Sequence, residues 1–111
     1  MSTSNIVMSP ELKSPWVTAL RSGEYQQGKR NLCRGAFYCC LGVLCEVMEA
    51  NRSVFDGNDE VIAFEGYIGH LHPRLAQEAG INDDALNQLM RMNDSQGKRF
   101  SEIADWIEAN L

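Results

Sequence analysis

The most prominent hydrophobic feature of the chain is a nearly uninterrupted apolar run from Phe37 to Met48. It holds three of the four cysteines and a single polar side chain, Glu46, before its end. A helix that is apolar almost all round is normally buried inside a domain. The run therefore predicts a central helix over about 38–49 that nucleates the core. Gly42 costs a helix interior about 1 kcal/mol relative to alanine, which indicates that another backbone passes close to it.

The pattern ahead of the central helix predicts one amphipathic helix and a long loop. Ser9-Pro10 and Ser14-Pro15 are both possible helix starts, since serine caps a helix and proline fits its first position. We expect the start at about residue 15, because proline is not tolerated deep inside a straight helix. A turn over 10–14 would precede this helix, and Gly23 would end it as the C-cap. Residues 23–36 are predicted to form a glycine-punctuated loop.

The segment after the central helix predicts a turn followed by a small hairpin. Residues 51–60 are rich in turn formers. Two short runs of strand-forming residues follow, at 61–64 and 67–70, and Glu65-Gly66 joins them. We expect these two runs to pair as a β-hairpin, with His70 and His72 at the end of the second strand.

The last third of the chain predicts three short helices. One covers residues 73–79 and is closed by Gly80. Another begins after a cap at Asn82, carries Leu86, Leu89, Met90 and Asn93 on one face, and breaks over 93–97. The last begins after a cap at Ser101 and runs to Leu111. Its predicted inward face consists of five residues: Phe100, Ile103, Ala104, Ile107 and Leu111.

Together these elements predict an α+β fold, a mostly helical single domain of about five short helices with one small β-hairpin. A chain of 111 residues suits one hydrophobic core. We assign residues 1–8 to a flexible N-terminus and residues 9–111 to the globular domain.

The net charge and the N-terminal sequence limit which partners and which cellular location we expect. The formal net charge of −5 disfavours indiscriminate binding to nucleic acid or to anionic lipid. The start of the chain lacks the basic segment of a signal peptide, and no stretch reaches the ~20 apolar residues of a membrane span. We therefore expect a protein of a reducing cytoplasm that has no membrane contact, and we expect no cofactor.

The four cysteines, Cys33, Cys39, Cys40 and Cys45, lack the paired spacing of structural zinc sites. We expect buried thiols in a reducing compartment, with Cys39 on the polar edge of its helix as the most accessible. Metal binding would require His70 and His72 to converge on the cysteines from distant loops. A cysteine nucleophile would likewise need one of these two histidines as its base.

Two motif-like stretches do not support the functions they resemble. Residues 23–30 have the glycine and lysine spacing of a phosphate-binding loop, but Arg30 replaces the Ser or Thr that would bind magnesium. Residues 83–111 could be read as a helix-turn-helix unit. Their connection is longer than the usual three to four residues, and their acidic charge would be repelled by DNA phosphates.

A basic stretch stands out from the acidic background and forms the candidate binding site. It could hold an anion or an acidic partner surface. The alternative surface is the acidic face of the last helix, formed by Glu102, Asp105 and Glu108. The candidate binding residues are Arg21, Tyr25, Gln27, Lys29, Arg30 and Arg34.

Three blocks of the sequence, at 16–28 (WVTALRSGEYQQG), 38–47 (YCCLGVLCEV) and 92–111 (MNDSQGKRFSEIADWIEANL), carry a resemblance. They resemble small uncharacterised proteins of tailed bacteriophages and prophages, which have W-x-x-A-L-x-S-G-x-Y-x-Q-G, C-C-L-G-V-L-C and N-D-x-G-x-x-F-x-E-I-A-D-x-I-E segments. This chain departs from the pattern at Pro15 and in the lengthened turn at Ser95-Gln96. The resemblance implies a phage setting, and hence the cytoplasm of a bacterial host, and it transfers no catalytic residue.

Three functions follow as expectations. The leading one is a non-enzymatic phage accessory protein that binds a host factor or modulates a host response. The second is a binder of a small anionic ligand, a nucleotide or a metabolite. The third is a small enzyme, disfavoured because the sequence offers no nucleophile with a base and no metal site.

Overall fold

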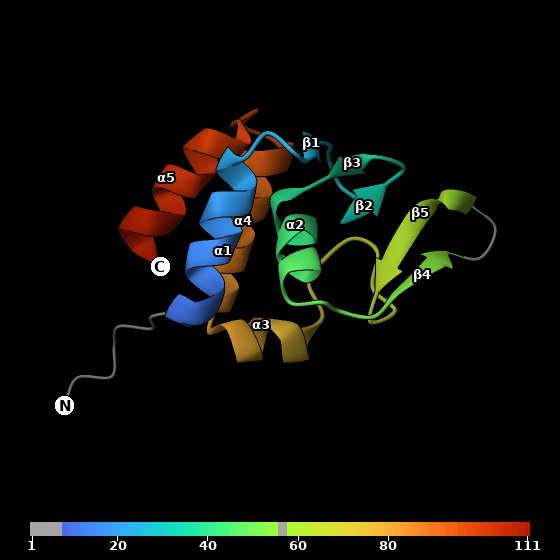
Figure 1. Cartoon of the computed structure of the whole chain (residues 1–111), viewed down its shortest axis with the longest axis horizontal. Coiled ribbons are helices and arrows are strands. Elements are labelled where there is room, and N and C mark those ends of the chain that lie inside the picture. Colours follow the sequence, from blue (N-terminus) through green and yellow to red (C-terminus); the bar gives the residue numbers. More distant parts are fainter. Residues whose placement is uncertain (1–7, 56–57) are drawn as a thin grey trace.

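The computed structural model describes residues 8–55 and 58–111 (Figure 1). Within these ranges the chain forms five helices and a five-stranded sheet. The helices are α1 (Pro10–Arg21), α2 (Cys40–Val47), α3 (Pro73–Ala79), α4 (Asp83–Asp94) and α5 (Phe100–Asn110). The strands are β1 (Gln26–Gln27), β2 (Cys33–Arg34), β3 (Phe37–Tyr38), β4 (Arg52–Phe55) and β5 (Asn58–Phe64). The predicted α+β class is confirmed.

The sheet has the strand order β1-β3-β2-β5-β4. β1 pairs with β3 in parallel, and the other neighbouring strands are antiparallel. Ile62 of β5 lies opposite Cys33 of β2 on one side and Val54 of β4 on the other. β4 ends the sheet, so one of its two edges has no neighbouring strand among the described residues.

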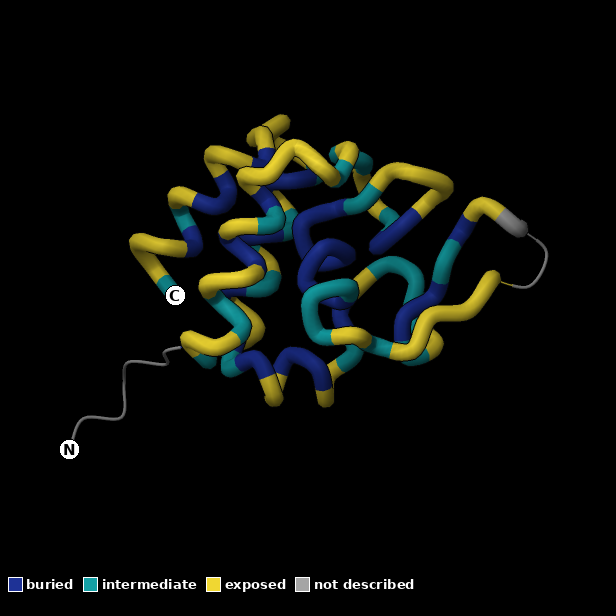
Figure 2. The backbone as a smooth tube through the Cα atoms, in the orientation of Figure 1, coloured by how far each residue is buried: buried dark blue, intermediate teal, exposed yellow. Residues whose placement is uncertain are grey.

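Helix α2 forms the centre of the core, as the apolar run predicts. All six residues from Cys40 to Cys45 are buried, and the helix lies between the sheet and the helices α1, α4 and α5 (Figures 1 and 2). The Trp16 indole of α1 donates a 2.9 Å hydrogen bond to the Cys40 carbonyl, which fixes α1 against α2. The helix is shorter than predicted, because Phe37 and Tyr38 belong to β3 and Cys39 is the N-cap.

The close backbone approach predicted at Gly42 is confirmed. A Cβ atom built on Gly42 would lie 1.8 Å from the Leu32 carbonyl oxygen and 2.7 Å from the Leu32 carbonyl carbon. That carbonyl also accepts a hydrogen bond from the Cys39 amide. Glycine at position 42 therefore allows the segment before β2 to lie directly on the first turn of α2.

Helix α1 begins five residues earlier than predicted, and Pro15 lies inside it. Pro10 occupies the first turn instead, with Ser9 as the N-cap. Pro15 is exposed, and the carbonyl that its missing N–H leaves unbonded belongs to Glu11, in the exposed first turn. Water can satisfy that carbonyl, so the helix continues through Pro15 and buries Trp16 and its neighbours. The predicted end is correct to within a residue, because Gly23 adopts a left-handed φ of 78° just after the C-cap.

The prediction of a featureless loop over residues 23–36 is wrong, because β1 and β2 lie within it. Each of these strands has two residues, too short to show an alternating pattern in the sequence. Both are defined by their pairing with β3, a long-range contact that local propensity does not reveal.

The predicted hairpin is half right. Residues 61–64 do form a strand, as part of β5, but its hairpin partner is β4 and not the segment 67–70. That segment makes one isolated bridge, between Tyr67 and Phe64, across a tight turn at Glu65 and Gly66. His70 and His72 accordingly do not end a strand; the His72 ring accepts a hydrogen bond from the Arg74 amide and caps α3.

The three predicted C-terminal helices are confirmed, with small shifts at their ends. Gly80 closes α3 with a left-handed φ of 79°, and Asn82 caps α4 through a 2.8 Å hydrogen bond from the Ala85 amide. Helix α4 continues through Asn93 to Asp94. The cap of α5 is Arg99 and not Ser101, because the Glu102 carboxylate accepts the Arg99 amide and the Phe100 side chain enters the core.

The N-terminal boundary differs at one residue. The sequence assigns Met8 to the flexible terminus, whereas its side chain is fully buried and its amide donates to the Leu111 carbonyl. The rest of the predicted flexible segment, residues 1–7, lies outside the described residues. None of the described helices has the length and apolar character needed to cross a bilayer.

Candidate functional site

The residues of the basic stretch do not form one cluster in the structure. Arg21 lies at the end of α1 and bonds to helix α5, with its guanidinium 2.6 Å from Asp105 and 2.8 Å from Glu108. The hydrogen bond from Arg21 lowers the pKa of the Glu108 carboxyl. The basic stretch and the acidic face of the last helix, which the sequence offers as alternatives, thus meet and partly neutralise each other.

Gln27 and Tyr25 are engaged inside the fold. The Gln27 amide nitrogen donates to Asn93 Oδ1 at 3.0 Å and to the Lys98 carbonyl at 2.7 Å, while its oxygen accepts the Phe100 amide at 3.0 Å. Tyr25 packs edge-on against Tyr38, with ring centroids 5.0 Å apart. A ligand could reach the Gln27 amide only by breaking bonds that connect β1 to α4 and α5.

Lys29 and Arg34 lie together at a surface hollow of about 460 Å³ beside Phe37. The cavity is not purely cationic, since Glu60 also lines it and lies 3.6 Å from the Arg34 guanidinium. Arg30 is exposed but does not line this hollow; its amide donates to Asp94 in a turn with a left-handed φ of 72°. The structure therefore keeps two of the six predicted binding residues together at one cavity.

The large hydrophobic side chains exposed in the described part of the chain all lie on the sheet. They are Phe37 of β3, exposed by 51%, and Val54 and Phe55 of β4, exposed by 56% and 43%. All four residues of β4 are exposed, and the β4–β5 hairpin extends away from the helices (Figures 1 and 2). We call Val54, Phe55 and the open edge of β4 the sheet edge site.

The sequence analysis missed this site, although a signal was present. Ser53-Val54-Phe55 is followed by Asp56-Gly57, and Asp-Gly is one of the strongest two-residue hairpin signals. The dense run of turn formers over 51–60 led to the whole segment being interpreted as a turn. The pairing of Arg52 with Phe64 and of Val54 with Ile62 shows that it contains a strand.

Polar contacts with α2 and the core anchor the base of the sheet edge site. Glu46 of α2 accepts a 2.7 Å hydrogen bond from the Tyr38 hydroxyl and also pairs with the Arg52 guanidinium. The Arg52 guanidinium lies over the Phe64 ring, 5.8 Å from its centroid. The first residue of β4 is therefore fixed to the core, while Val54 and Phe55 further along the strand face solvent.

The cysteines are free thiols and all four are buried. Burial raises the pKa of the Cys39 thiol to about 11, and it also raises the pKa of Cys33, Cys40 and Cys45. Cys39 remains the most exposed of the four, at 7%. Among the described residues, no cluster of three or more His, Cys, Asp or Glu side chains could hold a metal ion.

We expect the native thiols to react slowly with Ellman's reagent and all four to react once the protein is unfolded, because the reactive thiolate is disfavoured by burial.

The raised pKa values of the four thiols also predict how the stability of the protein depends on pH. Above the unfolded pKa of about 8.5, unfolded thiols ionise while native thiols do not, so the free energy of unfolding should fall as pH rises. Urea denaturation at neutral and alkaline pH, with a serine variant of Cys45 as reference, measures this. Fast reaction of several native thiols with Ellman's reagent would contradict the burial of the thiols on which both predictions rest.

Comparison with known proteins gives a family and no activity. The model of the family described as Domain of unknown function (DUF8296) matches residues 8–68, more than half of the chain. The match spans α1 to β5 and stops before α3. No curated protein and no solved structure matches the chain.

Proposed function

The chain belongs to the DUF8296 family, and we propose that it is a non-enzymatic accessory protein of tailed phages or prophages that binds a host protein through the sheet edge site. The observation that carries this proposal is the exposure of Val54 and Phe55 on a strand whose outer edge has no neighbouring strand within residues 8–55 and 58–111. Exposed apolar side chains on an edge strand are the features of a surface that a partner covers.

The geometry of β4 supports one kind of partner in this proposal. An open strand edge presents a row of main-chain N–H and C=O groups, and an extended polypeptide segment is the ligand that pairs with such a row. We therefore propose that the occupant is a strand of a host protein with apolar side chains to cover Val54 and Phe55. Pairing of two β4 edges in a homodimer is the competing arrangement, and it would be detected as a change of oligomeric state.

The non-enzymatic part of the proposal is supported by how the polar residues of the resembling blocks are used. The Trp16 indole bonds to the Cys40 carbonyl, the Gln27 amide bonds to α4 and α5, and the Asn93 amide is buried. Each of these groups holds elements of the fold together. None is directed into a cavity beside a base or a nucleophile, the arrangement that catalysis requires.

The prediction for the sheet edge site is that Val54→Glu weakens binding of the host partner by at least tenfold. The new charge would be desolvated against an apolar partner side chain. The partner is first captured from a bacterial lysate and identified by mass spectrometry, and its affinity is then measured with purified proteins. Hydrogen exchange of the complex should show added protection of the β4 amides.

Thr18→Glu is the matched control, because Thr18 is exposed and branched at Cβ like Val54 but lies on α1. It should bind like the wild type. A captured protein that binds the Val54→Glu variant as tightly as the wild type, or leaves exchange at β4 unchanged, would show that the sheet edge is not the docking surface.

The second candidate function is binding of a small anionic ligand at the hollow lined by Lys29 and Arg34. If it is correct, ATP or inorganic phosphate should bind with an affinity that falls with added salt, since exposed charges are screened. Lys29→Glu combined with Arg34→Glu should abolish that binding and leave Val54-dependent partner binding intact. Both positions are exposed, so the free energy of unfolding should change by no more than about 0.5 kcal/mol.

A further inference from the structure

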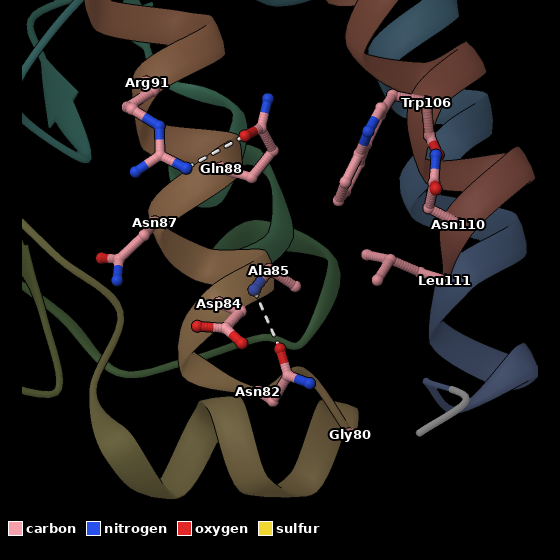
Figure 3. A pocket seen from close by; sticks show the side chains of 10 residues that line it. All are labelled: Gly80, Asn82, Asp84, Ala85, Asn87, Gln88, Arg91, Trp106, Asn110 and Leu111. Atoms are coloured by element: carbon pink, nitrogen blue, oxygen red, sulfur yellow. Dashed lines mark hydrogen bonds between the residues drawn. The ribbon is translucent and has the colours of Figure 1, made fainter. Parts of the chain in front are cut away.

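A second surface feature, a groove between α4 and α5, lies apart from the sheet (Figure 3). Its volume is about 660 Å³, within the roughly 300–1,000 Å³ range of small-molecule sites. The Trp106 ring projects from α5 into the gap, with Gln88 and Arg91 of α4 on the opposite wall. Asn110 and Leu111 lie below the ring on the α5 side.

The polar groups of the groove are dominated by carboxamides. Asn82, Asn87, Gln88 and Asn110 line it, together with one acid, Asp84, and one base, Arg91. The two opposite charges cancel, so the groove carries no net charge from its side chains. Asparagine is a poor helix former, and Asn87 lies exposed in the middle of α4, where helix stability does not account for it.

Hydrogen bonds within the groove fix which atoms face outward. Gln88 Oε1 accepts the Arg91 guanidinium at 3.0 Å, which leaves the Gln88 amide NH₂ available as a donor. Asn110 Nδ2 donates to the Trp106 carbonyl at 2.8 Å, which leaves its Oδ1 available as an acceptor. The α4 wall thus offers the Gln88 amide donor and the Asp84 carboxylate acceptor, and the α5 wall offers the Trp106 ring and the Asn110 acceptor.

From this arrangement we infer that the α4–α5 groove binds a neutral saccharide. Hydroxyl groups both donate and accept, so they match walls that offer amide donors and carbonyl or carboxylate acceptors. The C–H face of a sugar ring is apolar and can pack on the indole of Trp106. A nucleotide fits less well, because its phosphates would meet Asp84 and the overall charge of −5. This inference does not depend on the proposed partner of the sheet edge site.

The two tryptophans of the chain provide a direct test. Trp16 is fully buried and hydrogen-bonded in the core, so a ligand-dependent fluorescence change reports on Trp106. The protein is titrated with three sugars, maltotriose, cellotriose and chitotriose, and separately with adenosine 5′-monophosphate, each up to about 10 mM, a range that covers millimolar dissociation constants. We expect a saturable change with at least one of the three sugars, confirmed by calorimetry and insensitive to salt.

Gln88→Ala should weaken this binding at least fivefold, whereas Gln77→Ala should leave it unchanged. Gln77 is the matched control, because it is an exposed carboxamide on α3 that does not line the groove. Trp106→Leu, followed by calorimetry, should abolish binding. The inference is overturned if none of the three sugars binds, if the Gln88→Ala variant binds like the wild type, or if only adenosine 5′-monophosphate binds.

Discussion

Replacing Gly42 with alanine is expected to destabilise the protein by about 3 kcal/mol or more, as severe overpacking of a core does. The added Cβ would lie 1.8 Å from the Leu32 carbonyl oxygen, far inside van der Waals contact. The obstructing atoms belong to the backbone, so a side-chain rotation cannot relieve the clash. Either α2 moves away from the segment before β2, or the Leu32 carbonyl loses its hydrogen bond from Cys39.

The direction of the change in stability distinguishes the close approach at Gly42 from an ordinary helix interior. In an unobstructed helix interior, the same substitution would stabilise the protein by about 1 kcal/mol, because alanine is the better helix former. Gly69→Ala is the control, since the added Cβ there would make an ordinary 3.7 Å contact with the Arg30 carbonyl. Chemical denaturation of both variants decides the matter, and a Gly42→Ala protein as stable as the wild type would refute the close approach.

The sequence predicts the helical part of the fold well, because helices depend on local pattern. The apolar run at 37–48 and the turn residues Gly80 and Asn82 gave elements that the structure confirms. Pro15 misled the prediction of α1, since the burial of Trp16, Val17 and Leu20 outweighs one missing hydrogen bond near an exposed helix end. Helix ends of this kind are settled by tertiary packing and not by the local residues.

The sheet is predicted much less well, because its strands are short and pair over long distances. β2 joins β5, whose paired residues lie 27 or more positions further along the chain. The candidate binding residues of the basic stretch are likewise only partly brought together in the structure. Lys29 and Arg34 share a cavity, but Arg21 is bonded to α5 and Gln27 is bonded inside the fold. Charge along a sequence indicates where bases are frequent; it does not indicate which of them have partners.

The blocks that carry the phage resemblance meet at one point of the structure. Gln27 and Gly28 come from the first block, Cys40 from the second, and Asn93 from the third. Asn93 Oδ1 accepts hydrogen bonds from Gln27 Nε2 at 3.0 Å and from the Cys40 amide at 3.2 Å. Its Nδ2 donates to the Gly28 carbonyl and to Asp94, each at 2.9 Å. The asparagine thus uses its full hydrogen-bonding capacity while being 1% exposed.

We therefore expect Asn93→Ala to lower the free energy of unfolding by about 3 kcal/mol or more, since each buried polar group left without a partner costs about 1–3 kcal/mol. The Cys40 amide and the Gly28 carbonyl would each lose their hydrogen bond to Asn93, and Gln27 would lose its main contact with α4. Asn87→Ala is the matched control on the same helix, because Asn87 is exposed; its effect should stay within about 0.5 kcal/mol. Urea denaturation of the two variants measures the difference.

Asn93→Asp separates the loss of hydrogen bonds from the loss of packing. It keeps the shape of the side chain but replaces the NH₂ group, with its two donors, by an oxygen that donates only when the carboxyl is protonated. It also places this carboxyl group in a buried site beside the Gly28 carbonyl and Asp94. Burial and the neighbouring acid would raise the pKa of that carboxyl above its ordinary value of about 3.9. The protonated carboxyl is then the form favoured by the native state, so the stability deficit relative to wild type should be smallest near pH 4 and grow as pH rises through the raised pKa. A stability deficit that is the same at pH 4 and pH 8 would show that the side chain at position 93 contributes to stability through packing alone. The hydrogen-bond network of Asn93 would then not be what holds the three blocks together.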